Sequence, residues 1–350
     1  MFGRMMNNYY YGKSGKGDFR KEDLPETRSQ LFKDTLRTRL SALCRINLLC
    51  MLVWLPAMIV IFVCYGNIYT DLGTYDMIKN ENFAYYEEQV KGYGGEVRVT
   101  EEEYNRLKEE DVDLASYAYS SIFYMLLYLF PCIAITGPCT AGLSYVTRNW
   151  ARDEHAFIWT DFKDAVKKNW KIPLVISTVT GLLPLAAYEG WIFYGQMASK
   201  NMIMLVPQII VPMFGAVWAI SVTYMHPLTV TYDLKLKDDI RNGLILGVAR
   251  LPFSVGIRLL HCVPLAVYFV ATSIFRLDPM FGLVIHGAYY MLIGFALSRF
   301  VTASYTNAVF DRFINSRMEN VKVNQGMRET ADDDDDDDDD ADGTGEGGKE

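Results

Sequence analysis

Residues 136–171 read TGPCTAGLSYVTRNWARDEHAFIWTDFKDAVKKNWK, and this stretch decides the fold of the chain. It begins inside an apolar run, where Gly137-Pro138 is typical of a bend in a membrane helix. The small residues that follow let a second helix backbone come close. The stretch ends as a charged segment in which apolar residues from Phe162 to Trp170 recur at helical spacing. It therefore predicts the end of a membrane span followed by an amphipathic surface helix over residues 161–171.

The residue order within this stretch is also a recognisable signature. Gly-Pro leads into small residues, an aromatic residue and an arginine, and the segment W-x-D-F-K-x-A-x-K-x-N-W-K follows. In order and spacing this resembles the YesL-type bacterial integral membrane proteins, a domain of unknown function. A looser likeness at residues 40–56 and 253–300 extends the resemblance over most of residues 30–315. The residues that carry the signature are Gly137, Pro138, Ala141, Tyr145, Arg148, Asp161, Phe162 and Asn169.

The resemblance implies a role as well as a fold. Proteins of the YesL type resemble accessory proteins found with carbohydrate-uptake and polysaccharide-use systems, so a carbohydrate importer or another membrane protein is the expected partner. The resemblance also implies a bacterial source. No catalytic residue is established for the family, and none is carried over to this chain.

Composition alone does not separate a membrane protein from a soluble one, but the distribution of apolar residues does. Of the 350 residues, 51% are hydrophobic, and they gather in runs long enough to cross a bilayer, which requires roughly 20 residues each. We therefore expect an all-α membrane protein, a six-helix transmembrane bundle in contact with the lipid bilayer. The expected spans are 46–65, 117–142, 172–194, 202–225, 253–275 and 280–300.

Lysine and arginine near the ends of these spans predict the orientation. They concentrate before the first span, after the last, and in the connections between spans two and three and between spans four and five. By the positive-inside rule, these connections and both termini are cytoplasmic, in a multi-pass protein of the bacterial cytoplasmic membrane. The residues that decide this are Arg37, Arg39, Arg45, Arg148, Arg152, Lys163, Lys167, Lys168, Lys171, Lys235, Lys237, Arg241 and Arg250, with Arg299, Arg312, Arg317 and Lys322 after the last span.

The same patterns divide the chain into segments. We expect a flexible N-terminal segment, a surface helix with the first span, a small extracytoplasmic insert, the other five spans with two cytoplasmic surface helices, and a disordered acidic tail. The insert is acidic and Tyr-rich, and Thr100 begins a capping box that predicts a short helix over residues 101–109. The boundaries are 1–30, 31–66, 67–116, 117–318 (surface helices 161–171 and 235–250) and 319–350.

The net charge of −8 arises largely from this insert and from the nine aspartates of Asp332–Asp340. It gives no reason to expect a nucleic-acid partner. The aspartate run lacks the spaced ligands of a calcium loop. The six cysteines form no C-x-x-C pair, so the sequence predicts neither a zinc site nor another cofactor.

Charged side chains within the spans are the first candidates for a functional site, because burying charge in a bilayer is costly. Glu189 lies toward the outer end of the third span. Arg258 lies in the fifth span, with His261 three residues on. A functional interpretation has Glu189 meet a cation or a sugar hydroxyl and Arg258 meet an anion. The alternative is that Glu189 reaches the outer interface and Arg258 snorkels to the inner one.

The candidate docking residues are Phe162, Lys163, Lys167 and Trp170 of the surface helix, which would meet a soluble or membrane partner. Metalloprotease and nucleophile-elbow motifs are absent from the sequence, and we expect a protein that is not an enzyme. The leading hypothesis is a non-catalytic accessory or partner-docking protein linked to carbohydrate uptake or polysaccharide use. The alternatives are a solute transporter or permease-like subunit and, third, an intramembrane enzyme.

Overall fold

The described part of the protein is helical throughout. A computed structural model describes residues 24–328 except 93, 98, 111–112 and 320, and these residues form α-helices with short turns and no strand. Six stretches are long and apolar enough to cross a membrane, which confirms the all-α membrane bundle. They are α2 (Arg28–Asn80), α5 (Leu114–Ala134), α8 (Lys171–Ala198), η2 with α9 (Met202–Met204 and Leu205–Thr231), α11 (Leu251–Ser273), and α12 (Pro279–Tyr289) with η3 (Tyr290–Gly294) and α13 (Phe295–Phe313).

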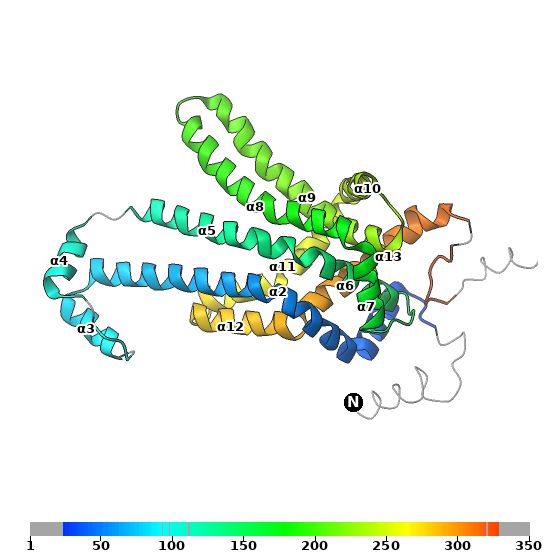
Figure 1. The fold of residues 1–350 in the computed structure, drawn as a ribbon, viewed down its shortest axis with the longest axis horizontal. Helices are drawn as coiled ribbons and strands as arrows, with labels where there is room; N and C mark the ends of the chain where they lie inside the picture. The colour runs from blue at the N-terminus through cyan, green and yellow to red at the C-terminus, as the bar shows by residue number, and fades with distance from the viewer. Residues whose placement is uncertain (1–23, 93, 98, 111–112, 320, 329–350) are drawn as a thin grey trace, which may run out of the picture.

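The long helices run roughly along the longest axis of the molecule, as Figure 1 shows for α2, α5 and α12. Helices α8 and α9 form an antiparallel hairpin that leans away from α2 and α12 toward its tip. One end of the bundle carries α6 (Thr136–Ala151), α7 (Thr160–Asn169) and α10 (Leu236–Ala249), and we call it the α7 end. The other carries α3 (Phe83–Gly92) and α4 (Glu101–Glu109), and we call it the α4 end.

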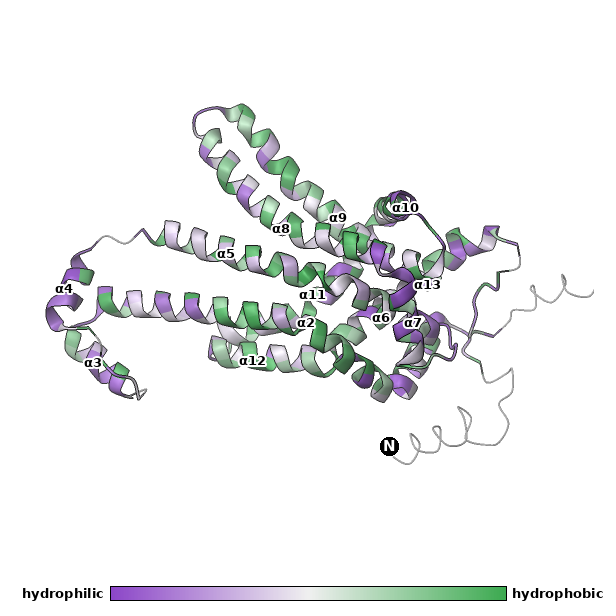
Figure 2. Ribbon diagram, in the orientation of Figure 1, coloured by the Kyte–Doolittle hydropathy of each residue, from purple (hydrophilic) through white to green (hydrophobic). Residues whose placement is uncertain are grey.

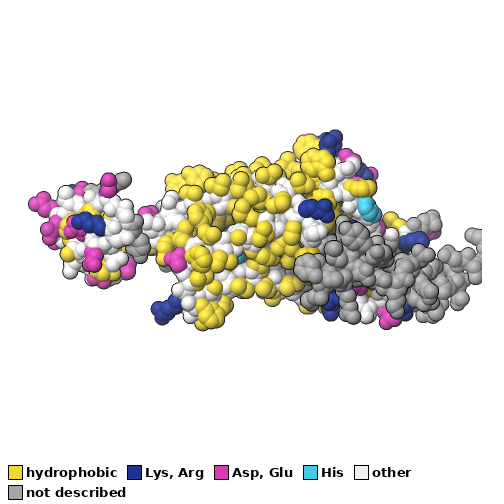
Figure 3. All heavy atoms as spheres, turned by 90° about the horizontal axis from the view of Figure 1, so that it is seen from below, with side chains coloured by type: hydrophobic (Ala, Val, Ile, Leu, Met, Phe, Trp, Pro, Cys, Tyr) yellow, Lys and Arg dark blue, Asp and Glu magenta, His cyan; other side chains and the backbone are white. Residues whose placement is uncertain are grey.

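Hydropathy follows this division. Hydrophobic residues colour the middle of the long helices, whereas α4 and α7 are mainly hydrophilic (Figure 2). In the space-filling view, apolar side chains cover the broad middle of the molecule, and the small lobe of α3 and α4 carries acidic groups (Figure 3). This is the surface expected of a bundle that has lipid around its waist and water at its ends.

Two predicted segments differ in detail from the structure. The predicted surface helix and first span are one continuous 53-residue helix, α2, which extends to Asn80 and so contributes its last turns to the predicted insert. The predicted second span breaks at Ile135, so Gly137-Pro138 lies in the first turn of α6 rather than within one bent helix. A proline is tolerated there because the first turn has no backbone acceptor for its missing N–H.

The insert packs onto the end of α2. Its helix α4 has the predicted bounds, and the side chain of Thr100 accepts the backbone N–H of Glu103. Tyr104 is fully buried and its hydroxyl donates to the carbonyl oxygens of Met77 and Glu81, at 3.2 and 3.1 Å. These bonds satisfy the last carbonyls of α2, so the helix end and the insert hold one another in place.

A single asparagine stabilises the break in the last span. The π-helical turn η3 leaves backbone groups without their usual helical partners. Asn47 of α2 donates to the carbonyl oxygens of Tyr290 and Met291, both at 2.8 Å, and accepts the N–H of Ala296 at 2.9 Å. Within a bilayer these groups would otherwise lack partners, so Asn47 fixes α2 against the last span.

The α7 end is tied together by a buried charge network around Asp311, on α13. Arg28 and Arg152 lie 2.8 and 3.5 Å from the carboxylate, and Asn315 donates to it at 2.6 Å. Only 3% of the Asp311 side chain is exposed. The network therefore joins the start of α2, the end of α6 and the last helix.

The predicted disordered tail begins at residue 319, but the chain remains packed beyond it. Gln325 accepts from Arg152 at 2.9 Å, Asn324 accepts from Arg28 at 2.6 Å, and the N–H of Arg328 donates to Pro25. The folded part therefore extends at least to residue 328. Most of the predicted N-terminal segment 1–30 and the run Asp332–Asp340 lie outside the described residues.

We predict that Asp311→Ala lowers the free energy of unfolding by about 3–5 kcal/mol, because it removes the buried carboxylate shared by Arg28, Arg152 and Asn315. The measurement is the thermal unfolding midpoint of the detergent-purified protein. The exposed Glu319→Ala is the matched control and should change stability by no more than about 0.5 kcal/mol. Equal midpoints for the two variants would contradict the role given to Asp311.

Candidate functional site

The structure gathers part of the signature around a polar cleft at the α7 end. The cleft has a volume of about 420 Å³ and lies between α6, α7 and the end of α9. Tyr145, Asp161 and Asn169 line it together with Lys168 and residues 229–233. Signature residues from two helices therefore meet at one place, although the sequence spaces them over 25 positions.

The other signature residues position this cleft through packing. A Cβ added at Gly137 would lie 2.3 Å from the carbonyl oxygen of Pro173, so only glycine lets α6 approach α8 so closely. Ala141 is fully buried, and Phe162 and Val166 of α7 lie directly over Gly142. Phe162 thus faces the bundle rather than the surface.

The exposed part of the predicted docking set is Lys163, Lys167 and Trp170. Two more aromatic residues precede α7 and are more exposed than Trp170: Phe157 is 64% and Trp159 is 60% exposed. The short connection before α7 is held by Asp161, whose carboxylate accepts the N–H of Phe157 at 2.8 Å. The result is a helix with a fixed inner face and a basic, aromatic outer face.

A buried carboxyl group lies next to the cleft. Asp239, in the first turn of α10, is fully buried and accepts one hydrogen bond from the hydroxyl of Thr229, a cleft residue, at 3.1 Å. Its other oxygen has no partner among the described residues. Burial raises the pKa of Asp239 from 3.8 to about 7, since desolvation disfavours the charged form more than the single hydrogen bond stabilises it.

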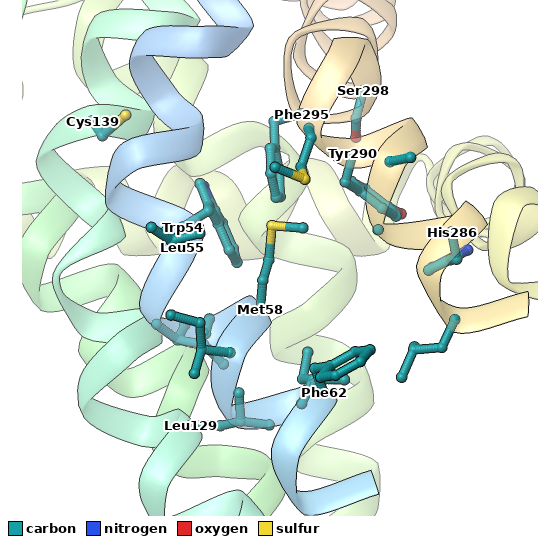
Figure 4. A pocket seen from close by; sticks show the side chains of 18 of the residues that line it. Trp54, Leu55, Met58, Phe62, Leu129, Cys139, His286, Tyr290, Phe295 and Ser298 are labelled. Carbon is teal, nitrogen blue, oxygen red and sulfur yellow. The ribbon is translucent and has the colours of Figure 1, made fainter. Parts of the chain in front are cut away.

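A second hollow lies between the membrane helices. It has a volume of about 760 Å³ and is lined by residues of α2, α5, α6, α12, η3 and α13. Figure 4 shows Trp54, Met58 and Phe62 along one side of it, with Cys139 and Ser298 at one end and Leu129 at the other. Because α6 and α13 lie toward the α7 end, Cys139 and Ser298 mark the cavity's α7 end. Most of the lining is apolar, and Arg299 is its one lysine or arginine.

The predicted intramembrane residues Arg258 and His261 lie close to Arg299. His261 is 3.1 Å from the carbonyl oxygen of Ser298 and so ties α11 to α13. Arg258 and Arg299 are near enough to repel one another, and His226 of α9 experiences both charges. The Nε of Arg258 is buried and has no partner among the described residues.

Glu189 belongs to a different place. It joins α8 to α5, because the hydroxyl of Tyr119 donates to both of its carboxylate oxygens at 2.7 and 2.9 Å. The ring of Tyr188 stacks on that of Tyr119 at 5.7 Å between centroids. The structure thus separates Glu189 from Arg258 and His261, and its observed partner is a tyrosine hydroxyl.

Sequence reasoning missed Arg299, which it counted among the basic residues after the last span. The missed signal is the sequence that follows: α13 continues to Phe313, with Thr302, Thr306 and Phe310 buried along it. An arginine followed by four more helical turns of buried residues does not lie at a helix end. Within the described residues, no three His, Cys, Asp or Glu side chains gather as a metal site would require.

The raised pKa of Asp239 predicts that stability decreases as pH rises. The folded protein holds this proton up to about pH 7, whereas the unfolded chain releases it near pH 3.8, so folding binds a proton between these values. Stability should fall across that window, by on the order of 4 kcal/mol, since each pKa unit is worth about 1.4 kcal/mol. Thermal midpoints at pH 5 and pH 8, which span about two of these units, should show about 3 kcal/mol of this loss.

The Asp239→Asn variant should lose this dependence and be more stable than the parent at pH 8. Asp238→Asn, at the exposed neighbouring position, should keep it. A parental pH profile in Asp239→Asn would show that the buried carboxyl is not its source.

Comparison with known proteins places the signature within a described family. Residues 117–189, which include all of the stretch 136–171, match the family model described as "Protein of unknown function, DUF624". The chain is also 27% identical over 164 residues to the "Uncharacterized protein YesV" of Bacillus subtilis (strain 168), an overlap that covers 47% of this chain and 76% of that protein. No solved structure matches the chain. The likeness to the DUF624 model therefore lies in the part of the chain that contains the signature, residues 117–189.

Proposed function

We propose that this protein is a non-catalytic accessory protein of the bacterial cytoplasmic membrane, of YesL type, which docks a partner protein on the outer face of α7. In this proposal the α7 end and both termini are cytoplasmic, and the α3–α4 lobe is outside. The observation that carries it is the construction of α7, which is fixed on one face and presents basic and aromatic groups on the other.

The fixed face makes α7 a rigid platform. Phe162 and Val166 pack over Gly142 so closely that a Cβ added there would lie 2.8 and 2.7 Å from them. Since α6 is itself buried in the bundle, α7 cannot shift without disturbing the packing of the spans. Because the helix is already fixed, little conformational entropy is lost when a partner binds to its outer side chains, and this favours binding.

The exposed face suggests the chemistry of the partner. Lys163, Lys167 and Lys168 are all exposed, and Trp170 lies at the end of the helix with 44% of its surface accessible. Lysines steer an acidic surface toward the helix, and aromatic side chains are the anchors found most often at interface centres. We therefore propose a partner that presents acidic residues around an apolar pocket.

The carbohydrate link rests on the YesL-type resemblance and not on geometry. It makes the cytoplasmic side of a carbohydrate importer the proposed partner. The largely apolar lining of the cavity favours this role over sugar transport by the bundle itself, because a sugar pathway requires a polar cavity near mid-membrane.

We predict that the triple variant Lys163→Glu, Lys167→Glu, Lys168→Glu loses importer subunits that co-purify with the parent protein from native membranes. Charge reversal turns attraction into repulsion at the interface, so recovery should drop roughly tenfold or more. Quantitative mass spectrometry of the tagged protein's partners, after crosslinking, measures this recovery. The control is Lys200→Glu, an exposed lysine in the turn between α8 and η2.

Equal recovery of importer subunits with the triple variant and with Lys200→Glu would contradict docking through α7. Sugar accumulation by liposomes that contain this protein alone would contradict the accessory role and favour the transporter.

A further inference from the structure

The cavity between the membrane helices combines an apolar length with a charged end. Trp54, Met58 and Phe62 recur every fourth residue on α2 and so form one wall, about 12 Å long at 1.5 Å per residue. Arg299 and Thr140 line the same cavity, and Ser298, the residue before Arg299, lies at its α7 end (Figure 4). The hollow therefore offers one long apolar surface and one cationic terminus.

Among the described residues, no carboxylate forms an ion pair with the positive charge at this terminus. Neither Arg258 nor Arg299 has a hydrogen bond or an ion pair within the described part of the chain, and the Nε of Arg258 is buried without a partner. Arg258 lies one helical turn before His261, whose Nε2 is 3.1 Å from the carbonyl oxygen of Ser298, the residue before Arg299.

The Asp311 network shows that this bundle can pair a buried arginine when the arginine serves structure alone. Arg152 has Asp311 and Glu154 within 3.5 Å. Two neighbouring guanidinium groups that have no carboxylate partner carry two energetic penalties. They repel one another strongly at low dielectric, and burial deprives them of hydrating water. An anion from outside the chain would relieve both penalties, and guanidinium groups suit phosphate oxygens in particular.

We infer that this cavity binds an anionic phospholipid, with its phosphate beside Arg299 and Arg258 and one acyl chain along Trp54, Met58 and Phe62. The inference stands apart from the docking role of α7, because it uses other helices and another ligand.

The shape of the cavity favours a lipid phosphate over a free one. Its volume of about 760 Å³ falls within the range of small-molecule sites, yet most of it lies along apolar side chains that a phosphate ion would not fill. Two lining residues, Ile59 of α2 and Val284 of α12, are 54% and 52% exposed on the bundle surface. The cavity therefore opens on the side of the bundle, the surface that the acyl chains of the bilayer would contact.

The test is selective lipid retention by the full chain. Protein reconstituted in vesicles of equal phosphatidylglycerol and phosphatidylcholine is re-extracted in detergent, and the bound lipid is quantified by mass spectrometry. The parent should retain phosphatidylglycerol in clear excess. Arg299→Gln should lower this excess roughly tenfold or more, as expected for a lost charge-assisted contact. Arg312→Gln, near the end of α13, is its matched control and should leave the excess unchanged.

A second variant keeps both arginines and fills the apolar part of the cavity with a larger side chain. Gly287 lines the cavity, and a Cβ added there would lie 3.7 Å from Met58, so Gly287→Phe extends into the hollow without a backbone clash. It should lower retention of the lipid. Gly256→Phe, on α11, makes the same substitution where no atom lies within 4 Å, and it should retain lipid like the parent.

Three results would overturn the inference. These are equal retention of the two lipids by the parent, unchanged retention in both Arg299→Gln and Gly287→Phe, and displacement of the bound lipid by inorganic phosphate alone. If Arg299→Gln fails to fold, the decision rests on Gly287→Phe and on a fluorescence measurement.

The fluorescence of Trp54 is obtained as the difference between the parent and Trp54→Phe. Brominated phosphatidylglycerol should quench this fluorescence more strongly than brominated phosphatidylcholine does.

Discussion

The close approach of other helices to α6 is the constraint on which the rest of the structure depends. Thirteen of its 16 residues are buried, and it contacts α2, α7, α8, α9 and α13. Such crowding is possible because α6 carries small residues where neighbours cross, above all Gly137 under Pro173 and Gly142 under Phe162. Lipid offers no hydrophobic drive for helices to associate, so close packing of this kind has to supply it.

Both hollows of the molecule are built against this helix. Tyr145 lines the polar cleft at the α7 end, whereas Cys139 and Thr140, nearer the start of α6, line the apolar cavity between the spans. Helix α7, the proposed platform, borders the cleft. The lipid-facing helices α2 and α12 border the cavity. One well-packed helix thus positions a water-facing site and a lipid-facing site with no flexible segment between them.

Polar groups within the bundle fall into two kinds, and the contrast between them identifies the site. Asn47 satisfies the π-helical turn, Tyr119 satisfies Glu189, and Asp311 satisfies Arg152, so each of these groups has an evident structural role. Neither Arg258 nor Arg299 forms an ion pair within the described part of the chain. Burying unpaired charge is costly, and these two arginines differ in this from Arg152, which the same bundle pairs with Asp311 and Glu154.

The sequence by itself determined the membrane character, the six spans and the surface helix after the signature, because these depend on local runs and periodicities. It also predicted the small helix 101–109 through its cap. The tertiary structure decided what depends on distant partners: the continuity of α2 through Asn80, the pairing of Glu189 with Tyr119, and the placement of Arg299 in a cavity. A side chain's neighbours across a bundle come from helices up to 250 residues away, and no pattern along the chain records which of them it meets.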